Sequence, residues 1–182
     1  MYHISSDPRE IQSALILTKG LRKILQQKDA RLNISQLCKT AGVSRSTFYR
    51  LFDEVDDLLR YACENTLDGF LSKYLVQFSQ GSNESPAGMY AALVRSHSRE
   101  IQWMIQNGKI GILLHTHRWG LRKYASDFFP KMDPDSEEFA YFLDMRFGLL
   151  LGAFTAWLST GKKATEEELI SYAEQQIRFI EH

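Results

Sequence analysis

The chain of 182 residues holds 22 Lys and Arg residues and 22 Asp and Glu residues, so its formal net charge at pH 7 is zero. An evenly spread neutral charge would argue against a nucleic-acid partner. The charge is uneven, because nine basic and two acidic residues lie between Arg9 and Arg50, which leaves an acidic excess elsewhere. This distribution is typical of a small nucleic-acid-binding domain joined to a larger acidic one, and ordinary solvated helix surface is the alternative.

Cysteine content and apolar runs indicate a soluble protein of the cytoplasm. Cys38 and Cys63 are too few for a disulfide framework or a four-cysteine zinc site. The longest apolar run, residues 147–158, is shorter than the roughly 20 residues that span a bilayer. Residues 1–10 show no signal-peptide pattern, so we expect no membrane partner.

The sequence contains no pattern that indicates catalysis or metal binding. His115 and His117 are two positions apart, so on a helix their side chains point roughly 200° from each other and cannot share an ion. There is no glycine-rich phosphate loop, no catalytic order of Ser, His and Asp, and no pair of carboxylates in an apolar setting. We therefore expect no enzyme, no metal and no cofactor.

The first helix is predicted to start at Pro8, because Asp7 can cap it and Glu10 can reach back to the capping residue. Its packing face is predicted from side chains that recur at helical spacing, namely Ile11, Leu15, Thr18, Leu21 and Leu25. We expect this face to brace the two helices that follow.

A second helix is predicted over residues 34–41. Asn33 is a capping residue, and apolar positions recur every three or four residues, so one face is buried. Gly42 can adopt the left-handed conformation that ends a helix, and Val43 then packs into the corner. Ser44 is predicted to cap the third helix.

The third helix has two different faces. Phe48, Leu51 and Phe52 share one face, which we expect to be buried. The opposite face carries Arg45, Ser46, Tyr49 and Arg50. Such a helix can enter the DNA major groove, where arginine pairs with guanine and hydroxyls reach phosphates, so the two helices predict a helix-turn-helix. The alternative, a packing unit that touches no nucleic acid, explains the phenylalanines but not the exposed arginines and tyrosine.

Residues 34–59 resemble the DNA-binding domain of TetR-family transcriptional regulators, through Ala41-Gly42-Val43-Ser44, Thr47-Phe48-Tyr49, Phe52 and Asp57-Leu58-Leu59. Thr18-Lys19 and residues 45–49 are most similar to a branch that resembles regulators of dihydroxyacetone metabolism. The resemblance implies contacts with double-stranded operator DNA. With the capping residue Ser44 added, the predicted DNA-binding residues are Ser35, Ser44, Arg45, Ser46, Thr47, Tyr49 and Arg50.

The chain departs from the family pattern after the third helix. Many relatives place a lysine, which meets a phosphate, at the position of Val55, whereas residues 53–57 here are acidic. A missing phosphate contact weakens nonspecific affinity and flattens its salt dependence. We therefore expect weaker DNA binding than is usual in the family, or assistance from another part of the chain.

The rest of the chain is predicted to be helical, which gives an all-α fold of about nine helices. A long fourth helix runs from about residue 54 to 78 and leaves the DNA-binding part. Capping residues and apolar periodicity predict five more helices, which start near Pro86, Ser98, Lys109, Asp135 and Thr165. We expect a helix-turn-helix domain over residues 1–53 and an effector-binding and dimerisation domain over residues 54–182.

The last two helices are predicted to form a homodimer interface. The penultimate helix is apolar on nearly every side and must be covered, and in the family these two helices pair with their copies in a four-helix arrangement. The predicted interface residues are Gly148, Gly152, Ala156, Tyr172 and Ile177. The alternative is that both helices complete the core of the monomer. A dimer would present two recognition helices to an inverted-repeat operator.

Aromatic residues in the second half suggest a pocket for a small-molecule effector, and we expect its lining to include Trp103, His115, Trp119 and Phe147. The sequence thus predicts a ligand-responsive transcriptional regulator. Repression is the common mode that the resemblance implies, and activation would use the same architecture. A sensor or co-regulator of this fold that does not itself bind DNA is the alternative function.

Overall fold

The computed structural model describes residues 1–27, 30–81, 86–161, 164, 165, 167–169, 171, 172 and 175. The chain divides into two compact units. Unit 1 comprises Met1–Thr66 with Ser98–Leu113, and unit 2 comprises Leu67–His97 with Leu114–His182. Within the described residues no strand forms apart from an isolated bridge between Tyr2 and Phe52. The predicted all-α fold is therefore confirmed.

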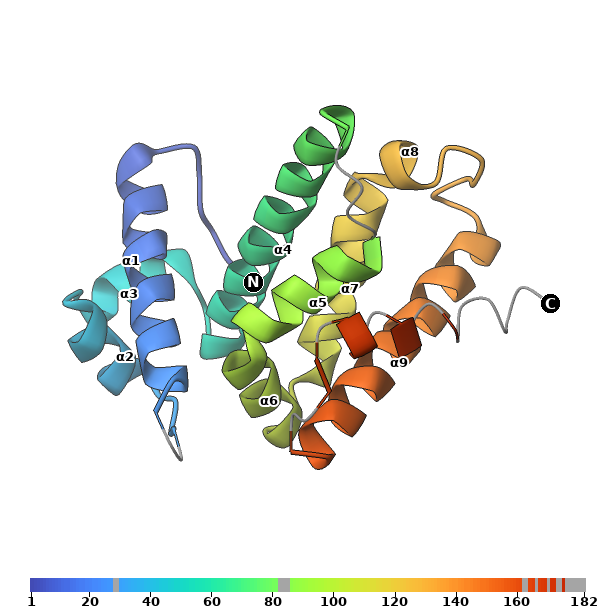
Figure 1. Cartoon of the computed structure of the whole chain (residues 1–182). Coiled ribbons are helices and arrows are strands. Elements are labelled where there is room, and N and C mark those ends of the chain that lie inside the picture. The colour runs from blue at the N-terminus through green and yellow to red at the C-terminus, as the bar shows by residue number, and fades with distance from the viewer. Residues whose placement is uncertain are drawn as a thin grey trace. The chain divides into compact units, whose positions relative to one another are not determined.

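Nine helices lie in the described part of residues 8–159 (Figure 1). Unit 1 contains α1, α2, α3, the first half of α4, α6 and the start of α7, and unit 2 contains the remainder. Their bounds are α1 Pro8–Leu25, α2 Ile34–Ala41, α3 Arg45–Leu51, α4 Val55–Ser79, α5 Pro86–Ser96, α6 Ser98–Gln106, α7 Ile110–Lys123, α8 Ala125–Phe128 and α9 Glu137–Ser159.

The start of α1 is capped as predicted, although Glu10 plays another part. The Asp7 carboxylate accepts the Arg9 amide proton at 2.8 Å, which satisfies one free donor of the first turn. Glu10 does not reach back to Asp7. Its carboxylate instead accepts the backbone N–H of Ser5 at 2.9 Å and the Ser5 hydroxyl at 2.7 Å. Hydrogen bonds thus hold the chain on both sides of Asp7, at Ser5 and at Arg9.

The buried face of α1 is rotated from the predicted one. Thr18, Leu21 and Leu25 are buried as predicted, but Ile11 and Leu15 are 38% and 40% exposed. Their places in the core are taken by Ala14, Leu17 and Ile24, none of which is exposed. The prediction followed the large side chains, whereas α1 packs against α2, α3 and α6 along a face that starts at the small Ala14.

The turn between α2 and α3 forms as predicted. The Asn33 side chain accepts the Gln36 amide proton at 2.9 Å, and Gly42 ends α2 in the left-handed conformation with φ 70°. Ser44 caps α3 by accepting the Thr47 amide proton at 3.0 Å. Each cap satisfies a backbone group that the helix end leaves unpaired.

Helix α6 belongs to unit 1, where its side chains hold the chain between α1 and α2. The Trp103 indole donates to the Ala30 carbonyl and the Arg99 guanidinium to the Gln26 carbonyl, both at 2.9 Å. Unit 1 is therefore larger than the predicted DNA-binding domain. The functional division into residues 1–53 and 54–182 stays a prediction.

Unit 2 has a core of its own, to which α4, α5, α7, α8 and α9 contribute buried side chains: Leu67, Leu71, Tyr74, Met89, Tyr90, Leu121, Ala125, Phe139 and Leu143. The helix predicted to start near Lys109 is interrupted at Tyr124, which leaves helical geometry with ψ 23°. The Tyr124 phenol is held by Asp68 at 2.8 Å and Ser72 at 2.7 Å. These tertiary bonds fix the break between α7 and α8.

The predicted capping box of the last helix is present. The Glu168 carboxylate accepts the Thr165 amide proton at 2.8 Å, and the Thr165 hydroxyl accepts that of Glu168 at 3.2 Å. Residues 167–169, 171, 172 and 175 are helical. Among the predicted interface residues, Ile177 lies outside the described residues.

Helix α9 is the one described helix that is long and apolar enough to cross a membrane by length and composition. Only 17% of its most apolar window is buried. The predicted lack of a membrane partner rested on the shorter run of residues 147–158, and that expectation stays a prediction.

We predict opposite effects for two Gly→Ala substitutions in helices. A Cβ at Gly20 would lie 2.9 Å from the Ala41 Cβ, whereas a Cβ at Gly69 would meet nothing within 4 Å. Both variants gain helix propensity of about 1 kcal/mol, but Gly20→Ala also overpacks α1 against α2 at a cost of about 1–3 kcal/mol. Urea unfolding should show Gly69→Ala to be more stable than Gly20→Ala by at least about 1 kcal/mol. Equal free energies of unfolding for the two variants would show that the packing between α1 and α2 leaves room for a Cβ at Gly20.

Candidate functional site

The outer face of α3 presents the predicted DNA-binding side chains. Arg45, Ser46 and Arg50 are exposed, and Tyr49 is 48% exposed. Phe48 lies beneath them, fully buried, with its ring edge-to-face against Tyr49 at a centroid distance of 5.5 Å. The buried ring fixes the rotation of α3, and the polar side chains project from the other face as a result.

Hydroxyl groups at the start of α3 are bonded to one another. The Ser44 hydroxyl lies 2.8 Å from the Ser46 hydroxyl and 2.8 Å from the Thr47 hydroxyl, in addition to its capping bond. Ser44 therefore serves mainly as a cap, while the Ser46 and Thr47 hydroxyls can rotate to donate to a phosphate oxygen. Ser35 is exposed in the first turn of α2.

Unit 1 exposes further basic side chains outside α3, which include Arg9, Lys19, Lys23, Arg31 and Lys39. Arg50 also acts on α1. The pKa of Glu10 is lowered first by its hydrogen bonds from Ser5 and, to a smaller extent, by the Arg50 charge. Arg50 is thus near enough to α1 to be partly balanced by Glu10, whereas Arg45 has no ion pair with any carboxylate that the structure describes.

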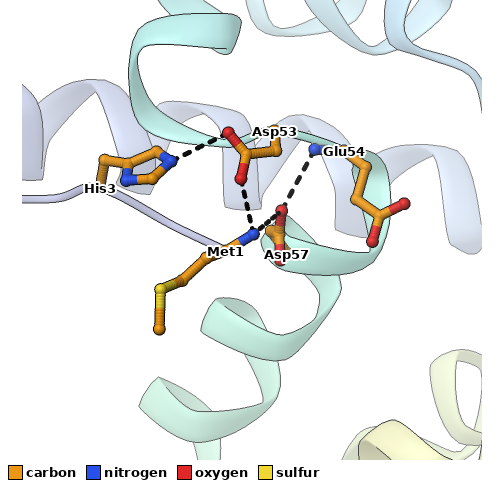
Figure 2. Close-up of polar contacts among 5 residues, drawn as sticks. All are labelled: Met1, His3, Asp53, Glu54 and Asp57. Atoms are coloured by element: carbon orange, nitrogen blue, oxygen red, sulfur yellow. Dashed lines mark hydrogen bonds and ion pairs between the residues drawn. The ribbon is translucent and has the colours of Figure 1, made fainter.

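The acidic corner between α3 and α4 is neutralised by the first residues of the chain. Figure 2 shows the Met1 amino group between Asp53 and Asp57, 2.8 Å from each carboxylate. The His3 ring lies 2.9 Å from Asp53. The pKa of Asp53 is lowered by the Met1 amino group and then by His3.

Asp57 has a structural role as well. It is almost fully buried, and its carboxylate accepts the Glu54 amide proton at 3.2 Å (Figure 2). The helix dipole also stabilises an acidic group in the first turn of a helix. Asp56 in turn pairs with Lys109 at 2.6 Å. The acidity of residues 53–57, which predicted weak DNA binding, is therefore largely compensated inside unit 1.

Sequence reasoning missed the pairing of residues 1–4 with this corner. The His3 amide donates to the Leu51 carbonyl at 2.8 Å, and the Tyr2 phenol donates to Glu64 at 2.6 Å. Tyr2 and Ile4 pack against the core of unit 1. In the sequence, Tyr2 and Ile4 alternate with polar residues, and this two-residue period could have predicted a short extended segment.

The predicted effector residues do not form one group. Trp103 lies in unit 1, where its indole is used by the Ala30 carbonyl. His115, Trp119 and Phe147 lie in unit 2, but His115 is exposed. The Trp119 ring carries the Lys123 ammonium at 5.4 Å from its centroid. The effector role of all four residues stays a prediction.

The buried imidazole of α7 is His117, which is 4% exposed. Its Nδ1 lies 3.2 Å from the Tyr90 hydroxyl, and its ring is 5.6 Å from that of Phe147. Burial and then the Arg146 charge lower the pKa of His117 to about 4, against opposing effects of the Leu143 carbonyl and Asp144. The imidazole is thus neutral at pH 7.

No protein-family model and no curated protein matches this chain. The solved structures that share its fold include two regulators. The TetR transcriptional regulator from Streptococcus agalactiae 2603V has a TM-score of 0.59 at 17% identity, over 94% of this chain and 96% of that one. The fatty acid degradation regulator FadR from Bacillus halodurans has a TM-score of 0.52 at 18% identity, over 94% and 95%. The predicted TetR-like fold is therefore confirmed.

We predict that His117 makes stability depend on pH. Because its pKa falls from 6.5 to about 4 on folding, the unfolded chain takes up a proton between these values that the folded chain does not. Its contribution is therefore fully present above pH 6.5 and is lost as the pH falls toward 4. Urea unfolding should show a loss of about 2 kcal/mol from this group between pH 7.5 and pH 5.

The variant His117→Gln should remove this part of the pH dependence. The control His115→Gln, which removes a surface imidazole of the same helix, should keep the wild-type dependence. Identical pH profiles for wild type and His117→Gln would contradict the assignment.

Proposed function

We propose that this protein is a DNA-binding transcriptional regulator whose α3 lies in the major groove of its operator. The observation that carries the proposal is the arrangement of α3, in which Arg45, Tyr49 and Arg50 are exposed while Phe48 is fully buried. A helix that only packed would not need two arginines and a phenol on its solvent face. The fold shared with two proteins named as regulators supports the same function.

The contacts divide by chemistry. Arg45 stands at the first position of α3, where its guanidinium can pair with a guanine edge. Tyr49 and Arg50 lie about one turn further on and are suited to phosphates, as are the hydroxyls of Ser35, Ser46 and Thr47. Compensation of the acidic corner leaves these groups to act without a strong opposing charge, because Asp53, Asp56 and Asp57 already have cationic partners.

We further propose that the regulator is a homodimer joined through α9. Side chains spaced three and four residues apart along α9 are exposed, which is the spacing of a helix–helix seam. They include large apolar residues at the start of the helix and small ones later: Tyr141, Met145, Gly148, Gly152, Thr155 and Ala156. Tyr172, which follows α9, is also exposed. Such a face on each copy supports two-fold pairing and an inverted-repeat operator.

A response to a small molecule completes the proposal. Helix α4 contributes Val55–Thr66 to unit 1 and its remaining residues to unit 2, so a ligand in unit 2 can bias the part of α4 that follows the recognition helix. Repression in the cytoplasm is the mode that the family resemblance implies. The dihydroxyacetone branch stays a prediction from residues 18–19 and 45–49.

The first experiment measures binding of the purified protein to DNA that flanks its own gene, at two salt concentrations. Saturable binding should weaken as salt rises. Arg45→Ala with Tyr49→Ala should weaken it by at least roughly tenfold, because the Arg45 contact with a base alone is worth about 1–3 kcal/mol. Arg122→Ala, an exposed arginine of α7, is the matched control and should bind as wild type does. Unchanged affinity in the double variant would contradict the role of α3, and no binding at low salt would instead favour a sensor or co-regulator.

A second experiment tests the dimer with two glycine variants. A Cβ at Gly152 or at Gly69 meets nothing within 4 Å in the single chain, so the folded monomer should accept Gly152→Glu and Gly69→Glu alike. Light scattering at micromolar concentration should give a dimeric mass for wild type and Gly69→Glu, and a monomeric mass for Gly152→Glu, since a carboxylate would be buried in the interface. A monomeric wild-type protein would contradict the proposed dimer.

A further inference from the structure

A cluster of buried polar side chains lies inside unit 2, contributed by three helices. Tyr90 of α5 and His117 of α7 are 6% and 4% exposed, and Nδ1 of the imidazole lies 3.2 Å from the phenol oxygen. Arg146 of α9 places its guanidinium carbon 5.8 Å from the centre of the Tyr90 ring. The three side chains thus form one continuous group.

Two nitrogen atoms of this cluster are buried and have no hydrogen-bond partner among the residues that the structure describes, namely Nε2 of His117 and Nε of Arg146. The nearby Leu143 carbonyl makes no hydrogen bond of normal geometry to Nε2. A buried polar atom left unpaired costs about 1–3 kcal/mol, so most proteins pair such atoms. Two unpaired nitrogens in one cluster therefore call for a common explanation.

Both nitrogens can act as donors. Burial raises the pKa of Tyr90 to about 12, although the Arg146 charge acts the other way, so the phenol keeps its proton. In the tautomer in which the phenol donates to Nδ1, one of the two directions open to this hydrogen bond, the neutral imidazole carries its own proton on Nε2. The Nε of arginine always carries a proton. The cluster therefore offers two N–H groups and needs oxygen acceptors.

The Arg146 charge is also unbalanced. No carboxylate in the described part of the chain forms an ion pair with it, because the neighbouring Asp144 is held by Arg118. An acceptor that also carries negative charge would satisfy both donors and this cation.

The surroundings of the cluster are apolar. The Phe147 ring lies 5.6 Å from that of His117, and Met89 and Leu143 are buried in the same core. Arg146 and Phe147 are only half-buried, so the cluster lies near the surface of the unit. An apolar body next to a negative group would fit this environment.

We propose that His117 and Arg146, with Tyr90 orienting the imidazole, form a binding site for a small organic carboxylate that carries an apolar group. The inference rests on the proposed function in one respect, since it identifies this carboxylate as the effector of the regulator. Of the four predicted effector residues, only Phe147 belongs to this site.

Calorimetry on the full chain without DNA tests the site, with acetate, hexanoate and benzoate as probes at constant ionic strength. Hexanoate or benzoate should bind saturably in the millimolar range or tighter and shift the NMR signals of the His117 ring. The neutral amides of the same acids should bind roughly tenfold more weakly, since they lack the charge that pairs with arginine. No saturable binding of any of the three carboxylates would overturn the proposal.

Variants locate the binding. Arg146→Gln should weaken it by roughly tenfold, while Arg122→Gln, which removes an exposed arginine of α7 and leaves the Arg118–Asp144 pair in place, should leave it unchanged. Tyr90→Phe keeps the charge but frees the imidazole, so it should weaken binding while its circular dichroism stays that of wild type. Equal affinities in wild type and Arg146→Gln would overturn the site.

The operator assay separates this proposal from the proposed function. Carboxylate binding by a protein that never binds DNA would leave the site standing and refute the regulator. If both bind, hexanoate or benzoate should change the operator affinity of the wild type and not that of Arg146→Gln, and an unchanged affinity would refute the effector role.

Discussion

Burial of Phe48 beneath α3 is the constraint on which the candidate DNA interface depends. A seven-residue helix has little stability of its own in water, so its position is set by the side chains that it places in the core. Phe48, Leu51 and Phe52 are fully buried, and two caps fix the ends of the preceding turn. Because the packing face is fixed, the opposite face must carry its arginines and tyrosine outward.

Local signals in the sequence predicted much of this arrangement. Asn33, Gly42 and Ser44 act through backbone groups only a few residues away, so their roles could be predicted without any knowledge of the fold. The rotated face of α1 and the break at Tyr124 could not, because each depends on partners distant in sequence. The same holds for His117, since periodicity separates it from His115 but does not say which of the two faces the core.

Charge illustrates the limit of counting residues along a sequence. The acidic residues among 53–57 suggested repulsion of DNA phosphates. Their carboxylates are nevertheless paired with the Met1 amino group, His3 and Lys109. In unit 2 the reverse holds, because Arg146 is one of many basic residues in the sequence and only the structure shows that none of the described carboxylates pairs with it. Net charge over a segment therefore says less about a partner than the pairing of each group does.

The attachment of α6 in unit 1 has a consequence for how the chain can vary. Trp103 and Arg99 donate to main-chain carbonyls, of Ala30 and Gln26 respectively, and any amino acid offers a carbonyl at those places. The connection between α1 and α2 can therefore drift in sequence among relatives while it stays anchored. Trp103 and Arg99 cannot be replaced as freely, because their side chains make these bonds. We therefore expect fewer substitutions among relatives at these two positions of α6 than in the segment that they hold.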